Sequence, residues 1–278
     1  MNKNLQIKVN KAIKTIQIAE PMALQYQDYG FHLAFSGGKD SQVIYELCKM
    51  AGVKFRPVMN ITTLDYPELM KFVRHNYPDV QFSHPVMNFY QLIINKGMLP
   101  TRQARFCCQY LKEQGGYNTV TLLGIRKQES VNRSKRNEVE ISHKKYSNTL
   151  DQFNIDKEKQ MVCIGGKDKI LLSPIIDWTT SDVWNFIRER KLEYCELYDK
   201  GYPRIGCMFC PMSGTKYKML DRKRYPKVEK SIKKSIKKLC EIGKYDNLDH
   251  NVDDIFDWWI SNDSIEPYKI KKKLRIKL

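Results

Sequence analysis

The chain has 278 residues, 42% of them hydrophobic, a formal net charge of +17 and eight cysteines. This length allows one large α/β domain, or one domain with a smaller appendage, and an ample core. No apolar run reaches the roughly 18 residues that a membrane span needs, and residues 1–18 lack the apolar stretch of a signal peptide. We therefore expect a cytoplasmic protein with no membrane partner, and reduced cysteines rather than a disulfide framework.

The first expected element is an N-terminal helix over residues 1–22. Its apolar residues recur at helical spacing and form one face, which consists of Leu5, Val9, Ile13 and Ile16. Pro21 is expected to end this helix, because proline cannot donate the backbone hydrogen bond that a helix interior requires.

Five later runs are rich in apolar or β-branched residues and are expected to form strands. They cover residues 31–35, 53–60, 80–85, 119–124 and 169–174. Helical patterns occupy residues 68–77, 89–96, 108–114 and 182–190, the last with Thr180 or Ser181 as its N-cap. Strands that alternate with helices predict an α/β fold, a parallel five-stranded sheet with helices on both faces. The long polar stretch 129–167 is expected to be a loop or lid.

The most informative motif lies between the first strand and the helix that follows it. It reads Ser36-Gly37-Gly38-Lys39-Asp40-Ser41. Two glycines let the backbone approach a phosphate closely, and the N–H groups of the first helical turn point at the anion with the helix dipole behind them. The motif is neither a Walker loop nor a dinucleotide-binding turn. An ordinary strand–helix turn with capping serines is the alternative. Residues 62–65 and 124–126 also follow strands, so we expect them to converge on the same site.

Four of the eight cysteines are paired in sequence. Cys207-Met-Phe-Cys210 puts two thiolates within reach of one metal centre, and the adjacent Cys107 and Cys108 bring the total to four. Four cysteines suit either a structural zinc ion or a [4Fe–4S] cluster. The spacing favours the cluster, because adjacent cysteines chelate a single ion awkwardly, whereas a cubane spreads its ligands over separate iron atoms. The other four cysteines are expected to be structural.

The C-terminal third is strongly basic. Residues 213–246 carry twelve Lys and Arg against four acids, and residues 269–277 carry six bases and no acid. We expect a basic helical C-terminal extension over residues 213–278, with Val228, Ile232, Ile236 and Leu239 on its buried face. Attraction of a polyanion such as nucleic acid is one interpretation. A lysine-rich composition with solvated helix faces is the other.

These motifs together resemble a known family. The loop is similar to the pyrophosphatase loop (PP-loop) of the adenine nucleotide alpha-hydrolase-like superfamily. A Cys-Cys pair followed about a hundred residues later by Cys-x-x-Cys resembles the phosphoadenosine phosphosulfate (PAPS) reductase family. Further matching segments are residues 63–68, 124–133, 173–184 and 197–207. The resemblance places a nucleotide-binding PP-loop domain with an iron–sulfur cluster over residues 23–212.

The resemblance also implies a set of site residues. Nucleotide binding is carried over to Ser36, Gly37, Gly38, Lys39, Asp40, Ser41, Thr63, Asp65, Gly124, Arg126 and Arg133. Lys39 and Arg126 would be catalytic by offsetting charge on the phosphates of ATP, with Mg²⁺ bridging those phosphates. The metal ligands of a [4Fe–4S] cluster would be Cys107, Cys108, Cys207 and Cys210.

One departure from the family changes the expected reaction. The reductases carry a nucleophilic cysteine in a C-terminal Glu-Cys-Gly-Leu-His motif that this sequence lacks, and Cys240 lies within an expected helix. The chain therefore more closely resembles the ATP pyrophosphatase/sulfurtransferases of DNA phosphorothioation. Such an enzyme would adenylate an acceptor, DNA or tRNA, and sulfur from a cysteine desulfurase, delivered through the cluster, would displace AMP. The alternatives are a phosphoadenylyl- or adenylyl-sulfate reductase that releases sulfite, and a non-catalytic nucleotide-binding module.

Overall fold

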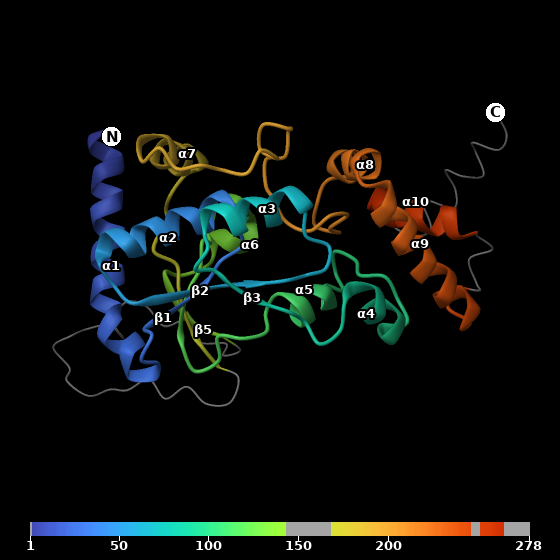
Figure 1. Ribbon diagram of the computed structural model, residues 1–278, viewed down its shortest axis with the longest axis horizontal. Helices are drawn as coiled ribbons and strands as arrows, with labels where there is room; N and C mark the ends of the chain where they lie inside the picture. The colour runs from blue at the N-terminus through green and yellow to red at the C-terminus, as the bar shows by residue number, and fades with distance from the viewer. Residues whose placement is uncertain (1, 143–167, 246–250, 264–278) are drawn as a thin grey trace. The chain divides into compact units, whose positions relative to one another are not determined.

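The computed structural model describes residues 2–142, 168–245 and 251–263, and its elements are labelled in Figure 1. The chain divides into two compact units, each assembled from separate stretches of sequence. Unit 1 comprises residues 1–60, 67–83 and 115–204, and unit 2 comprises residues 61–66, 84–114 and 205–278. The domain limits expected at residues 22 and 212 stay a prediction.

Unit 1 is built on a mixed sheet. In the described residues its six strands follow the order β3-β2-β1-β4-β6-β5. They are β1 Phe31–Ala34, β2 Phe55–Asn60, β3 Gln81–Ser83, β4 Val120–Leu122, β5 Val139–Ile141 and β6 Ile170–Leu172. The five expected strands correspond to β1, β2, β3, β4 and β6, which run parallel to one another. The all-parallel, five-stranded prediction is wrong in one respect, because β5 adds an antiparallel edge to β6.

The missed strand β5 lies in the stretch 129–167 that was expected to be a loop or lid. A 3-10 turn, η1 Lys127–Glu129, leads into this stretch, and a short helix, α6 Val131–Ser134, lies within its described part. In β5, Val139 and Ile141 are buried on either side of Glu140, and three residues are too few for alternation to stand out in a polar sequence. Residues 143–167 of the expected lid lie outside the described residues.

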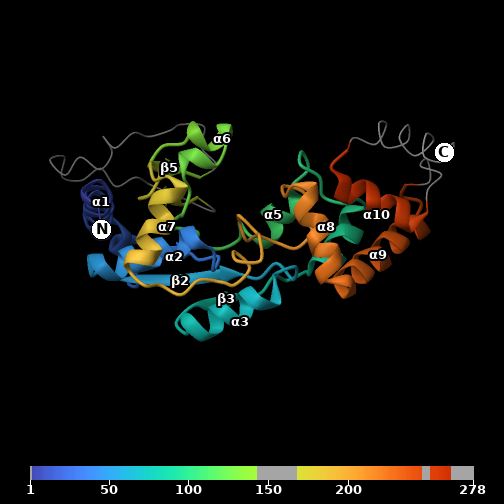
Figure 2. The ribbon, with the colours of Figure 1, turned by 90° about the horizontal axis from the view of Figure 1, so that it is seen from above.

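The longer helices of unit 1 lie on both sides of the sheet, as Figure 2 shows. They are α1 Lys3–Tyr26, α2 Lys39–Ala51, α3 Pro67–Asn76 and α7 Thr180–Glu189. Contrary to prediction, α1 does not end at Pro21 but continues for five more residues. Pro21 removes one backbone hydrogen bond from the helix. Packing outweighs this loss, because Ala19 and Ala23 on either side of Pro21 are buried and α1 packs against α2, β1 and β4. The N-cap of α7 is Thr179, one residue before the expected position, and its side chain accepts a hydrogen bond from Asp182 N–H.

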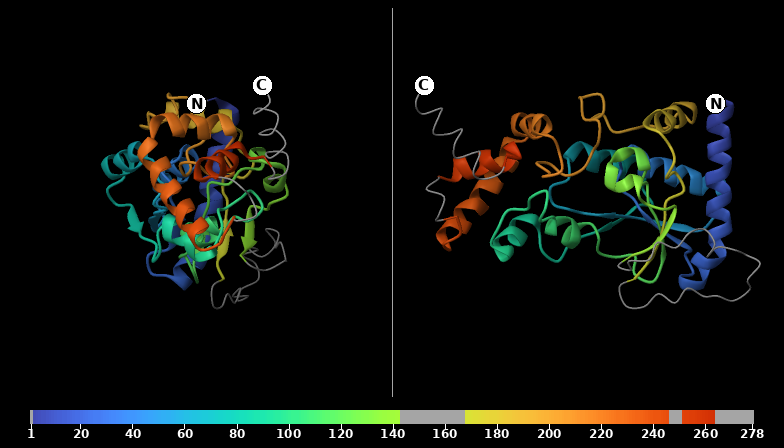
Figure 3. Two further views of the ribbon diagram at one scale, coloured as in Figure 1. Left: turned by 90° about the vertical axis from the view of Figure 1, so that its right-hand side faces the viewer. Right: turned by 180° about the vertical axis from the view of Figure 1, so that it is seen from behind.

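The described part of unit 2 is helical. Its helices are α4 Phe89–Lys96, α5 Phe106–Leu111, α8 Thr215–Arg224, α9 Pro226–Glu241 and α10 Val252–Ser261. The helix expected over 108–114 is thus shifted toward the N-terminus. The last three helices lie side by side (Figure 3), and α9 also packs on α4. The expected helical character of residues 213–278 is therefore confirmed for the described part, whereas the basic tail after residue 263 lies outside it. None of the described helices is long and apolar enough to span a membrane.

Candidate functional site

The Ser36–Ser41 loop joins β1 to α2 in unit 1 and is folded by its own hydroxyl groups. Ser41 Oγ donates to Gly38 C=O at 2.9 Å and accepts from Ser36 N–H at 3.2 Å. Gly37 has a φ of 69°, and a Cβ at this position would lie 2.6 Å from Val73 Cγ2. Only glycine satisfies both conditions, because it has no Cβ and adopts positive φ without strain. The turn is therefore held in one tight conformation at the start of α2.

The Asp40 carboxylate pairs with two cationic side chains at this loop, those of Lys39 and Arg126. Its Oδ2 accepts from Lys39 Nζ at 3.1 Å and its Oδ1 from Arg126 Nε at 2.7 Å. Arg126 is buried and also donates to the Thr180 hydroxyl at 3.2 Å. A Cβ on Gly124 would lie 2.9 Å from the backbone carbon of Asp40, so this segment fits closely against the start of α2. The structure thus brings the 36–41 loop together with Gly124 and Arg126.

Tyr198 is a residue of this site that the sequence did not reveal. Its hydroxyl accepts from the N–H of Lys39 at 2.8 Å, one of the donors expected to face a phosphate. Burial raises the pKa of Tyr198, so the hydroxyl stays protonated and retains a hydrogen to donate. The Trp184 ring packs edge-on against the tyrosine with 5.0 Å between ring centroids. The only sequence signal was the position of Tyr198 within the family-like segment 197–207.

The remaining predicted nucleotide residues lie elsewhere. Arg133 is paired with Glu129 four residues earlier, an i,i+4 contact near α6. Thr63 and Asp65 belong to unit 2, where the Thr63 hydroxyl accepts from the N–H of Phe89 at 2.9 Å. The Asp65 carboxylate accepts from Thr62 N–H at 2.7 Å and from its hydroxyl at 2.9 Å, which closes a tight turn. A role for these three residues in nucleotide binding stays a prediction.

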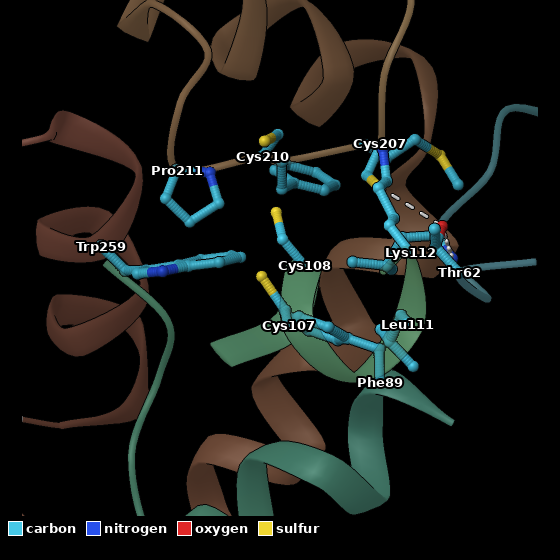
Figure 4. Close-up of a pocket in the computed structure, with 13 residues that line it drawn as sticks. Thr62, Phe89, Cys107, Cys108, Leu111, Lys112, Cys207, Cys210, Pro211 and Trp259 are labelled. Atoms are coloured by element: carbon cyan, nitrogen blue, oxygen red, sulfur yellow. Dashed lines mark hydrogen bonds between the residues drawn. The ribbon is translucent and has the colours of Figure 1, made fainter. Parts of the chain in front are cut away.

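In unit 2 all four paired cysteines line one pocket, which has an empty volume of about 390 Å³ including open solvent. In Figure 4 the sulfurs of Cys107 and Cys108 point from α5 toward the segment that carries Cys207 and Cys210. The rest of the wall is mainly apolar and includes Leu64, Phe89, Leu111, Met208, Phe209, Pro211 and Trp259. The structure therefore brings together the four sulfurs that sequence spacing had paired.

Hydrogen bonds within unit 2 fix the Cys207–Cys210 segment. The thiol of Cys207 donates to the Thr62 hydroxyl at 3.4 Å, shown by a dashed line in Figure 4. Met208 N–H donates to Leu64 C=O at 2.8 Å. Phe209 has a φ of 54°, and its N–H donates to the buried carboxylate of Asp221 at 2.9 Å. These bonds aim the thiols of the segment into the pocket.

The thiols and Lys112 influence one another electrostatically. A hydrogen bond from the Cys107 thiol lowers the pKa of Cys108, with Lys112 acting in the same direction. That bond and burial raise the pKa of Cys107. Burial likewise raises the pKa of Cys207, opposed by Lys112, and the Cys207 charge raises the pKa of Lys112 in turn. The pocket therefore favours thiolate at Cys108 beside an ammonium group that stays charged.

The donor set suits an iron–sulfur cluster. Among the described residues, no group of three or more His, Cys, Asp or Glu side chains is arranged to hold a metal ion. The four thiols are instead distributed along one apolar pocket with an ammonium group beside them. Thiolate ligands, mainly apolar walls and a nearby positive charge are features that accommodate a cluster of several iron atoms. The types of residue that line the pocket fit such a group, and a bound [4Fe–4S] cluster stays a prediction.

Comparison with known proteins gives one family match. The profile of the phosphoadenosine phosphosulfate reductase domain matches residues 30–213, more than half of the chain. An uncharacterized protein of Methanocaldococcus jannaschii is 29% identical over 66% of this chain and 42% of its own length. A protein of Schizosaccharomyces pombe named "Probable FAD synthase" is 27% identical over 65% of this chain and 60% of its own. Adenosine 5'-phosphosulfate reductase of Oceanobacillus iheyensis is 26% identical over 72% and 78%.

Two solved structures are among the matches in a structural comparison. FMN adenylyltransferase of Candida glabrata, in complex with FAD and inorganic pyrophosphate, has a TM-score of 0.49 at 14% identity, covering 74% of this chain and 64% of its own. PAPS reductase of Candida auris has a TM-score of 0.42 at 17% identity, covering 72% and 93%. In sequence, the matches span less than half the length of two Methanocaldococcus relatives, 42% and 35%.

Proposed function

Because the chain belongs to the phosphoadenosine phosphosulfate reductase domain family, we propose that it is an AMP-forming ATP pyrophosphatase that activates an acceptor for sulfur insertion. An oxygen of the acceptor attacks the α-phosphorus of ATP. The bond from that phosphorus to the α,β-bridging oxygen breaks, and pyrophosphate leaves with the electron pair. The acceptor is a nucleic acid, either DNA or tRNA, and a cysteine desulfurase supplies the sulfur.

The observation that carries this proposal is the pair of cations held by Asp40 at the start of α2. Lys39 and Arg126 both bond its carboxylate within 3.1 Å, and the loop beside them has the backbone form of an anion cradle. Negative charge that develops on the departing pyrophosphate would be stabilised by these two cations. Mg²⁺ bound with ATP would neutralise further charge on the phosphates. Asp40, which pairs with Lys39 and Arg126, is the carboxylate of this site that could face the ion.

Tyr198 extends the cradle. Its hydroxyl already occupies the Lys39 N–H, so a phosphate must either displace it or accept a hydrogen bond from it. Since the pKa of Tyr198 is raised, the hydroxyl can donate to a phosphate oxygen while it still accepts from Lys39. Tyr198 would then position the nucleotide without carrying charge.

The cysteine pocket of unit 2 would hold the iron–sulfur cluster of the proposed enzyme. Cys107, Cys108, Cys207 and Cys210 would ligate a [4Fe–4S] cluster, which when bound supplies a thiophilic site for handling sulfur. Lys112 would offset the negative charge of the thiolates, and the apolar walls would exclude water. The Thr62 hydroxyl would orient Cys207 through the bond described above.

A second candidate is a sulfonucleotide reductase. Several relatives are named adenosine 5'-phosphosulfate reductase, and the family profile is named for a reductase domain. In the described residues, Cys240 is the only cysteine after the Cys207–Cys210 pair, and it lies near the end of α9. A thiol held in a helix lacks the freedom to reach a substrate sulfur, which favours the pyrophosphatase.

One experiment separates these functions. Anaerobically purified protein is incubated with Mg²⁺–ATP and nucleic acid, and in parallel with adenosine 5'-phosphosulfate and thioredoxin. We expect AMP and pyrophosphate from ATP and no sulfite from the sulfonucleotide. Sulfite formation would instead establish the reductase, and nucleotide binding without either product would establish a binding module. Arg126→Met should abolish pyrophosphate release, whereas Arg190→Met, which removes an exposed ion pair of unit 1, should not.

A further inference from the structure

Helix α9 presents a row of lysines on one face. Its exposed positions are Pro226, Lys227, Lys230, Lys234, Lys237, Lys238 and Glu241. At 3.6 residues per turn the five lysines fall within about 100° of the circumference, and they extend along roughly 16 Å of the axis. The opposite face buries Ile232, Ser235, Ile236 and Leu239. The lysine row is thus held on a rigid helix by core packing on its other side.

The five lysines differ from Lys233 of the same helix. Lys233 bonds Glu229 at 2.6 Å and Asp253 of α10 at 2.7 Å, and these bonds raise its pKa. It thereby joins α9 to α10. The five exposed lysines form no ion pair with any described residue, so their charge is uncompensated within the part of the chain that the structure shows.

We propose that this lysine face of α9 binds the phosphate backbone of the nucleic-acid acceptor. The proposal rests on the function proposed above and assigns the acceptor a docking surface in the same unit as the cysteine pocket. Lysine ammonium groups at regular spacing bind phosphates as point charges and read no bases. The face therefore supplies affinity and orientation, and the choice of sequence or base lies elsewhere.

The alternative polyanionic surfaces fit this helix less well. A membrane-surface helix inserts its apolar face between lipids, but the apolar face of α9 is buried against α4, α8 and α10. A protein partner would require apolar or aromatic groups at the centre of the contact, where lysine is depleted. The exposed positions of α9 offer only lysines, one proline and one acid.

The test compares two triple variants of equal charge. Lys230, Lys234 and Lys237 are changed to Gln in one, and Lys3, Lys14 and Lys71, exposed lysines on α1 and α3 of unit 1, in the other. Each lowers the formal net charge of +17 by three, and Gln keeps helix propensity. Binding to duplex DNA and to tRNA is measured by fluorescence anisotropy from 50 to 200 mM salt. Vesicles containing phosphatidylserine form a third arm.

We expect the α9 variant to bind duplex DNA at least about tenfold more weakly, and its salt slope to fall by about 2.7, at 0.9 per lost phosphate contact. The unit 1 variant should keep the wild-type slope. Equal losses in both variants, an unchanged α9 variant, or binding to vesicles but to neither nucleic acid would each overturn the proposal. The arm with the larger effect identifies DNA or tRNA as the acceptor.

Pyrophosphate release from ATP is assayed in the same preparations, so the two proposals fail separately. Loss of nucleic-acid binding in the α9 variant supports the docking surface whether or not ATP is cleaved. Wild-type protein that binds nucleic acid through α9 but cleaves no ATP would refute the pyrophosphatase function alone. Circular dichroism of both variants verifies that the helices are intact.

Discussion

The phosphate loop of unit 1 and the cysteine pocket of unit 2 are completed in different ways. In the loop, the Ser36 and Ser41 hydroxyl groups bond each other and the backbone of Gly38, and the Asp40 carboxylate accepts from Lys39 and Arg126. In the pocket, the thiols face an apolar cavity, and the pKa values of Cys107 and Cys108 are driven apart by their mutual hydrogen bond. The first site is organised by hydrogen bonds within the chain itself. The second site brings together four thiols, which are the ligands that an iron–sulfur cluster would use.

The two sites should therefore respond differently when their ligands bind: nucleotide affinity depends on the loop, and the folding stability of unit 2 depends on the cysteine pocket. A preformed cradle loses little conformational freedom when a phosphate arrives, so its contacts contribute directly to affinity. Thiols lose their protons when they ligate a metal, and the free energy of metal binding adds to the folding free energy of such a site. Disruption of the loop should therefore affect nucleotide binding and the stability of unit 1, and disruption of the pocket should affect cluster content and unit 2.

The largest effect is expected from Cys207→Ser. Loss of one of the four proposed thiolate ligands should remove the visible absorption of the proposed cluster and lower iron and sulfide content to near zero. Cys240→Ser, on α9 of the same unit and outside the pocket lining, should leave both unchanged. The measurements are the absorption spectrum and iron–sulfide analysis of anaerobically purified protein. A colourless wild-type protein with one equivalent of zinc would contradict the assignment.

A smaller effect is expected from Arg126→Met. The Arg126 side chain is 3% exposed and bonds Asp40, whose side chain is 17% exposed, so its removal leaves a partly buried carboxylate with one cation fewer and should cost about 3 kcal/mol of stability. Arg190→Met breaks an ion pair with Glu46 in which the arginine is 42% exposed, and should cost under about 1 kcal/mol. Urea unfolding provides both values. Equal costs would show that the loop is not organised by its buried ion pairs.

The smallest difference is expected between two glycines of unit 1 with the same φ of 69°, Gly37 and Gly52. Each change to Ala should cost about 1–2 kcal/mol for the left-handed backbone. A Cβ at Gly37 would also meet Val73 Cγ2 at 2.6 Å and Leu69 Cδ1 at 2.8 Å, whereas Gly52 faces open space. The crowding should add about 2 kcal/mol and weaken ATP binding in Gly37→Ala alone. Thermal unfolding and titration with ATP measure the two effects, and matching values would contradict a tightly packed loop.

Sequence patterns predicted the parallel part of the sheet because its strands are short apolar runs bounded by turn residues. They did not predict β5, in which Glu140 separates only two apolar residues, nor the passage of α1 through Pro21, which depends on packing against elements distant in sequence. The cysteine pairing followed from spacing, and the loop residues followed from their motif. Tyr198 and Lys112 could not be recognised, because their importance depends on contacts over 159 residues in one case and across the cysteine pocket in the other.

The two cysteine pairs have a consequence for how the chain is made. Cys108 and Cys207 are 99 positions apart, and most of that interval belongs to unit 1. Closing a chain loop of this length costs roughly 4 kcal/mol by (3/2)RT ln n. During synthesis the first cysteine pair leaves the ribosome long before the second, so a nascent chain still holds only half of the proposed ligands when the final strand of the sheet, β6, has been translated. Folding of that sheet would shorten the effective loop, and cluster assembly would be the last step in the maturation of the protein.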